Sequence, residues 1–434
     1  MKTLTSSLLA TTTVVLVLGG WAYPSTTLRN PALRRAKSIT ITYWNTWGSA
    51  ASNNAQKHLI AIFEKTHPGI KVNLLGGTTP TKDLAAMASG SPPDVIQTWA
   101  NYEIPSWAAK GAILPLSSMI QHARLNLSEF SPTALHVFKN HGKVYALPYT
   151  EDVAMLYYNK ADFAASGIKQ PPKTIGQMLQ DAKKLTIVKN GKIVRLGFDP
   201  LYPYPYQRLW NYVFGGRFYN PATHKFTFTS PANVAALKFL VSYEHTYGLV
   251  RLTKAVAGFG NYSSATNPFF SGKLAMYVDG EWITSWIRQY APHLNYGVAP
   301  IPYPNGHPAL KDSGWVSPGA IFIPRNAAHP QAAFELIQFL TSPKWQGWFT
   351  GIRGKIPTTP ASLKNPLFAN NPKLLNFVRY STSPHLYNWP SLTVLPQLAT
   401  IWGKYEGLAL DFKISPGKAL AATQAKIQQA SRIP

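Results

Sequence analysis

Three stretches of this chain decide its fold class: Ile39–Trp44 (ITITYW), Ile70–Leu75 (IKVNLL) and Asp94–Trp99 (DVIQTW). Each is short, rich in β-branched and other apolar residues, and bounded by polar, glycine or proline residues, which is typical of a strand. A helix that Ser52 or Asn53 can cap lies between the first two stretches, and Lys82–Ser89 predicts a shorter helix before the third. Strands that alternate with helices predict an α/β protein with a parallel sheet.

The carboxyl ends of two of these strands carry aromatic and amide side chains. They read Trp44–Trp47 (WNTW) and Gln97–Tyr102 (QTWANY). Because ligands of open parallel sheets bind beyond the carboxyl ends of the strands, we expect a binding site at this edge.

The N-terminus has the pattern of an export signal. Lys2 precedes the apolar run Leu8–Ala22 (LLATTTVVLVLGGWA), and the small residues Gly20 and Ala22 suit cleavage near Ala22. The sequence therefore predicts a signal peptide over residues 1–22, a linker over residues 23–37 and an extracytoplasmic protein. An uncleaved anchor is the alternative, although the run is short for a membrane span. Basic linker residues lie on the side that must cross the membrane, where positive charge is unfavourable: Arg29, Arg34, Arg35 and Lys37.

Two features of the composition narrow the class of protein. The chain has no cysteine, which excludes disulfides, thiolate zinc sites, a cysteine nucleophile and a lipid-bearing N-terminal cysteine. It has 42 basic and 17 acidic residues, but the basic residues are scattered and form no nucleic-acid-binding motif, so we expect no nucleic acid partner. Few carboxylates also means few groups whose protonation destabilises the fold, which raises adaptation to an acidic exterior as a hypothesis.

The middle of the chain changes from strands to helices. Val144–Pro148 and Val153–Tyr158 are strand-like, and Thr174–Leu185 is helical. We place the crossing into a second lobe here, since 434 residues exceed the size of one hydrophobic core. The aromatic and proline-rich stretch Phe198–Phe218 is too irregular for one element, and we expect a loop that enters a helix at the cleft.

Eight collinear blocks resemble one known family. They are ITYWNTWG, FEKTHPGIKV, PPDVIQTWANYEIPSWAAKGAILPL, GKVYALPYTEDVAMLYYNKADF, FFSGKLAMYVDGEW, YGVAPIP, AFELIQFLTSPKWQGWF and GKIPTTPAS. The resemblance covers nearly all of the chain after Lys37. The family is the extracellular solute-binding proteins of carbohydrate ABC importers, which includes the maltose- and oligosaccharide-binding proteins. One block alone is weak evidence, but eight in the same order are specific.

The resemblance implies two α/β lobes joined by hinge strands, with a ligand cleft that closes on a sugar. Each lobe is discontinuous in the family. We therefore expect residues 38–148 and about 302–350 in the first lobe, and residues 149–301 and about 351–434 in the second. The resemblance also implies a monomeric binding protein rather than an enzyme, with no cofactor, that delivers its carbohydrate ligand to the membrane subunits of an ABC permease.

Candidate ligand-binding residues follow from the chemistry of sugars. Sugars combine apolar faces with hydroxyl groups, so aromatic rings, amides, carboxylates and guanidinium groups make up their sites. The strand ends of the first lobe offer Trp44, Asn45, Trp99 and Asn101, and the last two occupy a place similar to ligand contacts of the family. A buried anchor of the sheet is the structural alternative for Trp44.

Asp152 is the candidate at the hinge. It precedes VAMLYYNK, where the family often places a sugar-binding carboxylate. A structural hydrogen bond across the hinge is an equally good explanation, because buried polar groups need partners. Tyr204 and Trp210 are second-lobe candidates by their position in the aromatic stretch.

The sequence Asp279-Gly280-Glu281-Trp282 resembles the most recognisable second-lobe element of the family. Gly280 permits a close approach of the backbone, Trp282 offers a platform, and Asp279 is a polar candidate beside them. Trp315 and Arg353 complete the predicted site. An ion pair within the lobe is the structural alternative for Arg353.

Two other functions compete with sugar binding. A glycoside hydrolase would also combine aromatic rings with two carboxylates, and Glu151 and Glu281 could be drawn as such a pair. A receptor for glycerol 3-phosphate would suit a basic cleft that contains Arg353. The 13 Trp and 22 Tyr favour a neutral oligosaccharide. The sequence has no nucleotide-binding loop, nucleophile elbow or zinc-protease motif, and no His pair with metal-ligand spacing on a helix, so we expect no metal.

Overall fold

The computed structural model describes residues 38–203, 207–390 and 392–431. Contacts within the chain separate a unit that ends at Ser38 from a compact unit that begins at Ile39. The predicted signal peptide and linker, as well as the candidate Tyr204, lie outside the described residues.

The strands are β1 (Ile39–Asn45), β2 (Ile70–Gly76), β3 (Val95–Thr98), β4 (Lys139–Asn140), β5 (Lys143–Val144), β6 (Leu147–Asn159), β7 (Ile187–Lys189), β8 (Lys192–Arg195), β9 (Tyr219–Asn220), β10 (Lys225–Phe226), β11 (Met276–Gly280), β12 (Tyr296–Ala299), β13 (Gly314–Phe322) and β14 (Leu386–Tyr387). The α-helices are α1 (Ala50–Thr66), α2 (Pro80–Ala88), α3 (Ile104–Ala109), α4 (Ser117–His122), α5 (Pro132–His136), α6 (Lys160–Ala165), α7 (Ile175–Leu185), α8 (Gln207–Val213), α9 (Pro231–Tyr247), α10 (Leu249–Ala257), α11 (Ile283–Tyr290), α12 (Pro330–Thr341), α13 (Pro343–Arg353), α14 (Pro366–Ala369), α15 (Pro372–Ser381), α16 (Leu395–Leu410) and α17 (Pro416–Ala430). The short 3₁₀ helices are η1 (Asn101–Glu103), η2 (Leu127–Glu129), η3 (Pro308–Leu310) and η4 (Pro360–Lys364).

The predicted alternation of strands and helices is confirmed in the first lobe. β1 pairs in parallel with both β2 and β3, and α1 and α2 connect these strands. The expected cap of α1 was wrong. Ser49, rather than Ser52 or Asn53, caps the helix, because its side chain accepts a hydrogen bond from the backbone N–H of Ser52.

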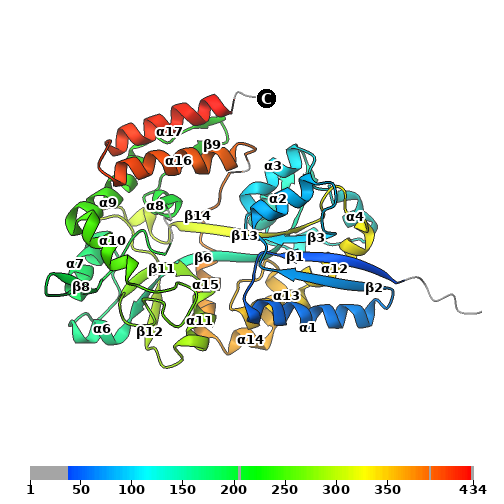
Figure 1. Ribbon diagram of the computed structural model, residues 1–434, viewed down its shortest axis with the longest axis horizontal. Coiled ribbons are helices and arrows are strands. Elements are labelled where there is room, and N and C mark those ends of the chain that lie inside the picture. Colours follow the sequence, from blue (N-terminus) through cyan, green and yellow to red (C-terminus); the bar gives the residue numbers. More distant parts are fainter. Residues whose placement is uncertain (1–37, 204–206, 391, 432–434) are drawn as a thin grey trace, which may run out of the picture. The chain divides into compact units, whose positions relative to one another are not determined.

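Two long strands, β6 and β13, lie side by side and run from one lobe into the other (Figure 1). The sequence predicted two separate strand-like runs; the structure places Val144 in β5 and joins residues 147–148 of the first run to the second run in the single strand β6. β13 pairs antiparallel with β6 and with β3, whereas the second half of β6 pairs with β11 and β12. The resulting order is β11-β6-β13-β3-β1-β2, and β6 places Glu151 and Asp152 at the crossing.

Separate hydrophobic cores define the two lobes. The first lobe is built around Phe63, Tyr149 and Phe334, with a smaller cluster around Trp107. The core of the second lobe extends from Val153 through the C-terminal helices. Because Tyr149 packs in the first lobe and Val153 in the second, the chain crosses between the lobes within β6.

The residues just before β13 pack with the second lobe. Ile301 belongs to its core, and Tyr303 exchanges backbone hydrogen bonds with Lys173 and Ile175 at the start of α7. We therefore propose that the chain returns to the first lobe within β13, later than the boundary expected at about residue 302.

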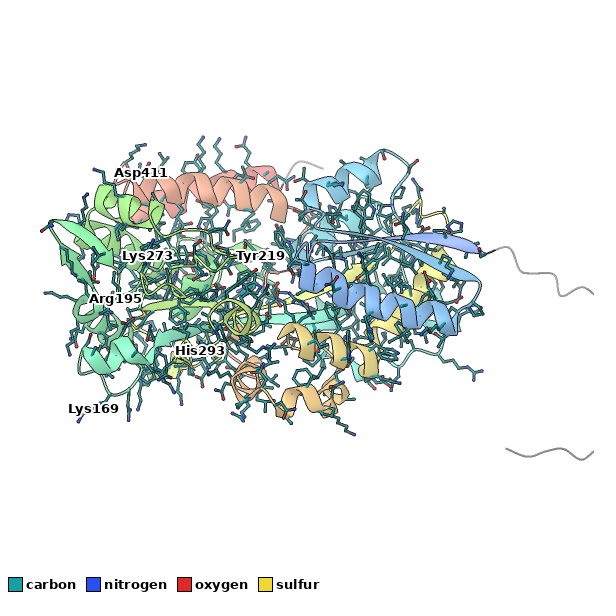
Figure 2. The ribbon with its side chains drawn as sticks, turned by 60° about the horizontal axis from the view of Figure 1, so that its bottom comes forward. Lys169, Arg195, Tyr219, Lys273, His293 and Asp411 are labelled. Atoms are coloured by element: carbon teal, nitrogen blue, oxygen red, sulfur yellow. The ribbon has the colours of Figure 1, made fainter. Side chains whose placement is uncertain are left out.

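Acidic residues are mostly inside the molecule and basic residues outside it. All 17 acidic residues are described, and only Glu129 and Asp411 are exposed. Nine of them are buried: Asp83, Asp94, Glu151, Asp152, Asp199, Glu244, Asp279, Glu281 and Glu406. Exposed lysines such as Lys169 point away from the ribbon (Figure 2). Most of the carboxyl groups that acidification protonates therefore lie inside the protein rather than on its surface.

Candidate functional site

Three buried charged residues meet where the hinge enters the second lobe. The Lys355 Nζ lies 2.8 Å from the Asp152 Oδ1 and 3.1 Å from the Glu281 Oε1. β6 supplies Asp152, Glu281 follows β11, and Lys355 follows the left-handed Gly354 that ends α13. The other oxygen of Glu281 accepts a hydrogen bond from the backbone N–H of Val153, at 3.1 Å. These three side chains are called the hinge triad below.

Burial and mutual charge set the protonation of these groups. Burial raises the pKa of Glu281 well above its ordinary value, the Lys355 ammonium opposes this rise, and the Asp152 carboxylate adds to it. Burial alone would lower the pKa of Lys355, but the two carboxylates beside it raise that pKa. Burial, followed by the charge of Asp152, raises the pKa of the neighbouring Glu151 to about 7, against a hydrogen bond from Ser381.

An indole from each lobe faces the ammonium of the hinge triad. The Lys355 Nζ lies 4.3 Å from the centre of the Trp282 ring and 6.0 Å from that of Trp47. Trp47 follows β1 and is held in the first lobe by stacking on Phe349, with ring centres 5.5 Å apart. Trp282 follows β11 in the second lobe. The triad therefore lies where aromatic side chains of the two lobes approach each other.

The position of Trp282 depends on the absence of a side chain at Gly280. A Cβ atom on Gly280 would lie 2.0 Å from the Trp282 ring, so only glycine lets the indole lie against the backbone of this turn. The indole N–H donates to the hydroxyl of Tyr262 at 2.8 Å, and this hydroxyl donates to the Asp279 carboxylate at 2.9 Å. Tyr157 donates to the Gly280 carbonyl at 2.8 Å. The turn is thus a rigid support for one aromatic ring.

Buried polar groups of the first lobe gather at the carboxyl ends of its strands. Asn45 ends β1 and lies opposite Gln97 of β3. The Asn45 Oδ1 accepts a hydrogen bond from the Trp47 N–H at 2.9 Å, whereas its Nδ2 has no hydrogen-bond partner among the described residues. Both side-chain polar atoms of Gln97 are likewise enclosed without a described partner.

Asp83 of α2 adds a carboxylate to this lobe. Its side chain is fully buried, and neither oxygen has a partner with hydrogen-bond geometry among the described residues. Burial raises the pKa of Asp83 to about 6, while nearby Thr78 and Lys82 oppose the rise. Thr78 adjoins Asn45, because the Thr78 N–H donates to the Asn45 carbonyl. Because buried polar groups normally have partners, we treat these atoms as candidate ligand contacts. We refer to Asn45, Gln97 and Asp83 as the first-lobe edge.

No three His, Cys, Asp or Glu side chains within the described ranges cluster in a way that could hold a metal ion.

Residues 44–347 match the family described as bacterial extracellular solute-binding protein. The chain belongs to this family. This solute-binding protein is 29% identical to CpMnBP1, solved with mannobiose bound, over 90% of this chain and 100% of that chain, with a TM-score of 0.82. The two-lobed α/β fold and the family resemblance of the eight sequence blocks are thereby confirmed. The family is one of binding proteins, not of enzymes.

Two curated relatives bind different solutes. The solute-binding protein is 24% identical to the maltotriose-binding protein of Pyrococcus abyssi over 74% of this chain, and it spans 66% of the length of that relative. It is 25% identical to the sn-glycerol-3-phosphate-binding periplasmic protein of Rhizobium meliloti, over 80% of this chain and 83% of that protein.

Several residues predicted from the sequence lie near one another in the solute-binding protein. Asp152, Asp279, Gly280 and Trp282 form or support the hinge triad, and Asn45 belongs to the first-lobe edge. The Asn101 Nδ2 lies 3.4 Å from the Asn388 Oδ1, so Asn101 reaches the second lobe, while its own Oδ1 is enclosed without a described partner.

The tryptophans of the first lobe differ in exposure. Trp99 is 45% exposed, and its ring centre lies 6.4 Å from that of Tyr102, which in turn lies 6.2 Å from that of Trp389 in the second lobe. Trp44 is half-buried, with the Lys82 Nζ 5.1 Å from its ring centre. Trp315 is also half-buried and lies in β13 opposite Tyr387 of β14.

Trp210 is placed in the core of the second lobe rather than at a binding surface. It is fully buried, packs on Phe239 and Phe198, and donates its indole N–H to the Pro200 carbonyl. We therefore leave it out of the proposed site. Arg353 is half-buried, and its guanidinium lies 3.4 Å from the Ser49 hydroxyl, whereas the expected alternative was an ion pair.

Sequence reasoning did not single out six residues of the candidate site as ligand-binding residues: Lys355, Glu281, Trp47, Tyr262, Gln97 and Asp83. Trp47 stands two residues after the candidate Asn45, and Lys355 stands in the block GKIPTTPAS, so both were within reach of a position-based argument. Nothing local in the sequence distinguishes Asp83 or Tyr262 from surface residues, because their surroundings come from distant parts of the chain.

Proposed function

We propose that this protein is the extracytoplasmic receptor of an ABC importer, and that it binds a sugar or oligosaccharide between its lobes and delivers it to the permease. The observation that carries this proposal is the hinge triad between an indole of each lobe, Trp47 and Trp282. Aromatic faces stack on the apolar faces of sugars, and carboxylates accept hydrogen bonds from sugar hydroxyls. The mannobiose bound to CpMnBP1 supports the same class of ligand.

The proposed ligand contacts come from both lobes. From the first lobe they are Trp44, Trp47, Asn45, Asp83, Trp99 and Asn101. From the hinge and the second lobe they are Asp152, Trp282 and Trp315, with Asp279 and Gly280 as supports of Trp282 rather than contacts. The proposed contact Arg353 ends α13, which packs in the first lobe through Phe349. A monomer is sufficient for this proposal, because every residue in it comes from one chain.

The charges of the site favour a neutral ligand over a phosphate ester. A phosphate would meet Asp152 and Glu281 in the second lobe and Asp83 in the first, and Lys355 is already paired with the first two. Arg353 is the cation that would favour a polyol phosphate, the ligand class of the Rhizobium relative. Since the carboxyl groups of the proposed site outnumber this one half-buried guanidinium, we place glycerol 3-phosphate second.

We also propose that the protein does not hydrolyse its ligand. In a glycosidase, a carboxylate or an activated water attacks the sugar while a second carboxyl group donates a proton. Glu281 is fully buried, and both of its oxygens are bonded, one to the Val153 N–H and one to Lys355. A carboxylate held in this way cannot approach a sugar carbon.

The proposed location outside the cytoplasm rests on the family and on the predicted signal peptide. Among the residues that the structure describes, none of the helices combines the length and the apolar character needed to cross a bilayer. Edman sequencing of the secreted or membrane-bound protein would decide between cleavage near Ala22 and a retained anchor.

A thermal-shift screen tests the proposed function. Mannobiose, maltotriose, monosaccharides and glycerol 3-phosphate are added to the purified protein at pH 7 and pH 4, and free reducing ends are assayed in parallel. A neutral sugar is expected to raise the unfolding midpoint without the release of new reducing ends, because a ligand that binds only the native state stabilises it. Selective stabilisation by glycerol 3-phosphate would favour the second candidate, and turnover of a glycan would contradict a pure binding role.

A further inference from the structure

Lys355 differs from the other lysines named above in that its charged end lies inside the protein. Only 8% of the residue is exposed, whereas Lys82, Lys169 and Lys344 are exposed. Removing an ammonium group from water is costly unless partners replace the lost hydration. The hinge triad supplies two carboxylate partners within 3.1 Å. The placement of this cation therefore depends on Asp152 and Glu281, and the closeness of these two carboxylates depends equally on the cation.

The partners of Lys355 belong to different parts of the molecule. Both carboxylates lie on the hinge or in the second lobe, and the Trp282 ring is fixed in the second lobe through Tyr262. Trp47 is the contribution of the first lobe, and it is 6.0 Å from the ammonium. Lys355 itself follows α13, whose Phe349 packs in the first-lobe core, so the two ion pairs join the end of α13 to carboxylates of the hinge and the second lobe.

Other charged groups surround the triad but do not replace Lys355. Glu151 precedes Asp152 on β6, and its backbone N–H donates to the Ile356 carbonyl next to Lys355. Asp279 lies on the far side of Gly280 and is bonded to Tyr262. Arg353 lies two residues before Lys355 but contacts Ser49, and Arg288 lowers the pKa of Arg353 in addition to the larger effect of burial. Lys355 is thus the cation that contacts the carboxylates of the triad.

We propose that Lys355 is the positioning residue of the binding site, which holds Asp152 and Glu281 together beside Trp282 and lets Trp47 of the first lobe close onto this assembly. The proposal rests on the proposed function for its ligand, but the ionic clamp itself exists in the protein alone. When all three groups are ionised, the triad carries one net negative charge.

The clamp has a defined dependence on pH. Without Lys355, two buried carboxyl groups would share a small volume, and one of them would retain a proton to higher pH. The native state of such a variant would hold this proton where the unfolded chain has lost it. Glu151 makes the stability of both proteins fall as the pH rises from 5 to 8, and the added proton would make the stability of the variant fall more steeply than that of wild type. A loss of packing alone would lower stability by the same amount relative to wild type at both pH values.

The test compares Lys355→Met with wild type by thermal unfolding at pH 5 and pH 8 and by calorimetric titration with mannobiose. Methionine keeps much of the length of the side chain and removes the charge. We expect the unfolding midpoint to fall by about 5 °C at pH 8 and by less than half of that at pH 5. We expect mannobiose affinity at pH 8 to fall about tenfold or more.

A second substitution identifies charge as the cause. Glu281→Gln in the Lys355→Met background returns the triad to one negative charge, and we expect it to restore at least half of the lost midpoint at pH 8. Lys344→Met is the matched control, since Lys344 is exposed and lies 4.4 Å from the centre of the Trp345 ring. We expect it to unfold like wild type. Lys355→Arg keeps the charge and should remain folded if Lys355→Met does not.

The outcomes separate this inference from the proposed function. A Lys355→Met protein that unfolds like wild type, or a loss that is equal at both pH values and not restored by Glu281→Gln, would overturn the clamp. If wild type binds none of the sugars while the unfolding results follow the expected pattern, the role of Lys355 as a clamp is supported and the proposed ligand is wrong.

Discussion

The turn that supports Trp282 and the first-lobe edge lie in opposite lobes and are built in opposite ways. In the turn, polar groups have protein partners: Tyr262 joins Trp282 to Asp279, and Tyr157 binds the Gly280 carbonyl. At the first-lobe edge, both oxygens of Asp83 and both polar atoms of Gln97 are enclosed without a partner among the described residues.

From this difference we infer that the two lobes contribute to ligand binding in different ways. The second lobe offers a rigid ring and a carboxylate whose positions are fixed before any ligand arrives, which lowers the entropy lost on binding. The first lobe has buried hydrogen-bonding groups without a described partner of hydrogen-bond geometry, and we propose sugar hydroxyls as their partners. Substitutions in the turn should therefore damage both fold and binding, whereas substitutions at the first-lobe edge should damage binding alone.

The largest effect is expected for Gly280→Ala. The added methyl group would lie 2.0 Å from the Trp282 ring and would displace it. We expect about 1–3 kcal/mol lower stability from the forced shift, and a roughly 100-fold loss of sugar affinity, which corresponds to about 2.7 kcal/mol. Chemical denaturation and calorimetric titration measure the two effects.

Gly403→Ala is the control for this change. Gly403 lies within α16, and a Cβ there meets no atom within 4 Å. Alanine should raise stability by about 0.5–1 kcal/mol through helix propensity and leave binding unchanged. If the two alanine variants behave alike, the rigid turn does not have the role assigned to it.

Asp83→Asn tests the first-lobe edge directly. The carboxyl group has its pKa raised to about 6 by burial, so at pH 7 the ionised form destabilises the fold. The neutral amide should therefore raise stability at pH 7 by about 1 kcal/mol, a value discounted for partial solvation. The same change should weaken sugar binding about tenfold, because an acceptor is lost. Lower stability together with unchanged affinity would show that Asp83 is a structural group. That result would contradict the proposed difference between the two lobes.

The next prediction concerns Glu151, which should make the stability of the hinge depend on pH. Its pKa is raised to about 7, mainly by burial, from 4.5. The native state thus keeps a proton that the unfolded chain loses between these values, so stability should fall as the pH rises from 5 to 8. We expect Glu151→Gln to remove about 2 kcal/mol of this change in the free energy of unfolding, measured by denaturant titration at both pH values. Equal pH profiles for the two proteins would contradict a buried, titrating Glu151.

The smallest effect is expected for Trp99→Ala. This side chain is 45% exposed at the end of β3, so little packing is lost on truncation. A fewfold decrease in sugar affinity with a stability change within about 0.5 kcal/mol is the expected result by calorimetry and denaturation. A loss as large as that of Gly280→Ala would move the main platform from the second lobe to the first.

Much of the fold follows from local patterns in the sequence. The alternation of strands and helices between Ile39 and Thr98 and the helix that begins after Thr174 are properties of short segments, and the structure confirms them. The continuity of β6 from the end of the first predicted run through the second run was not foreseen. This continuity comes from pairing with β13, which is more than 150 residues away in the sequence.

The candidate site was less predictable than the fold for the same reason. Asp152 and Gly280 could be named because they lie in blocks that resemble a family. The partner of Asp152 could not, because Lys355 is 203 residues away and only the folded chain brings the two together. Trp210 illustrates the same limit, because the sequence places an aromatic residue near a predicted cleft, but only packing decides whether the ring faces the core or a ligand, and here the ring lies in the core.

Calorimetric titration of wild type and Trp282→Ala with mannobiose, maltotriose and glycerol 3-phosphate is the most direct test of the central claim, that a neutral sugar binds between the lobes against a preformed second-lobe ring. The account predicts that a neutral sugar binds wild type and that Trp282→Ala loses most of this affinity while it still unfolds cooperatively. Binding of glycerol 3-phosphate in preference to the sugars, or sugar binding that survives Trp282→Ala unchanged, would contradict it.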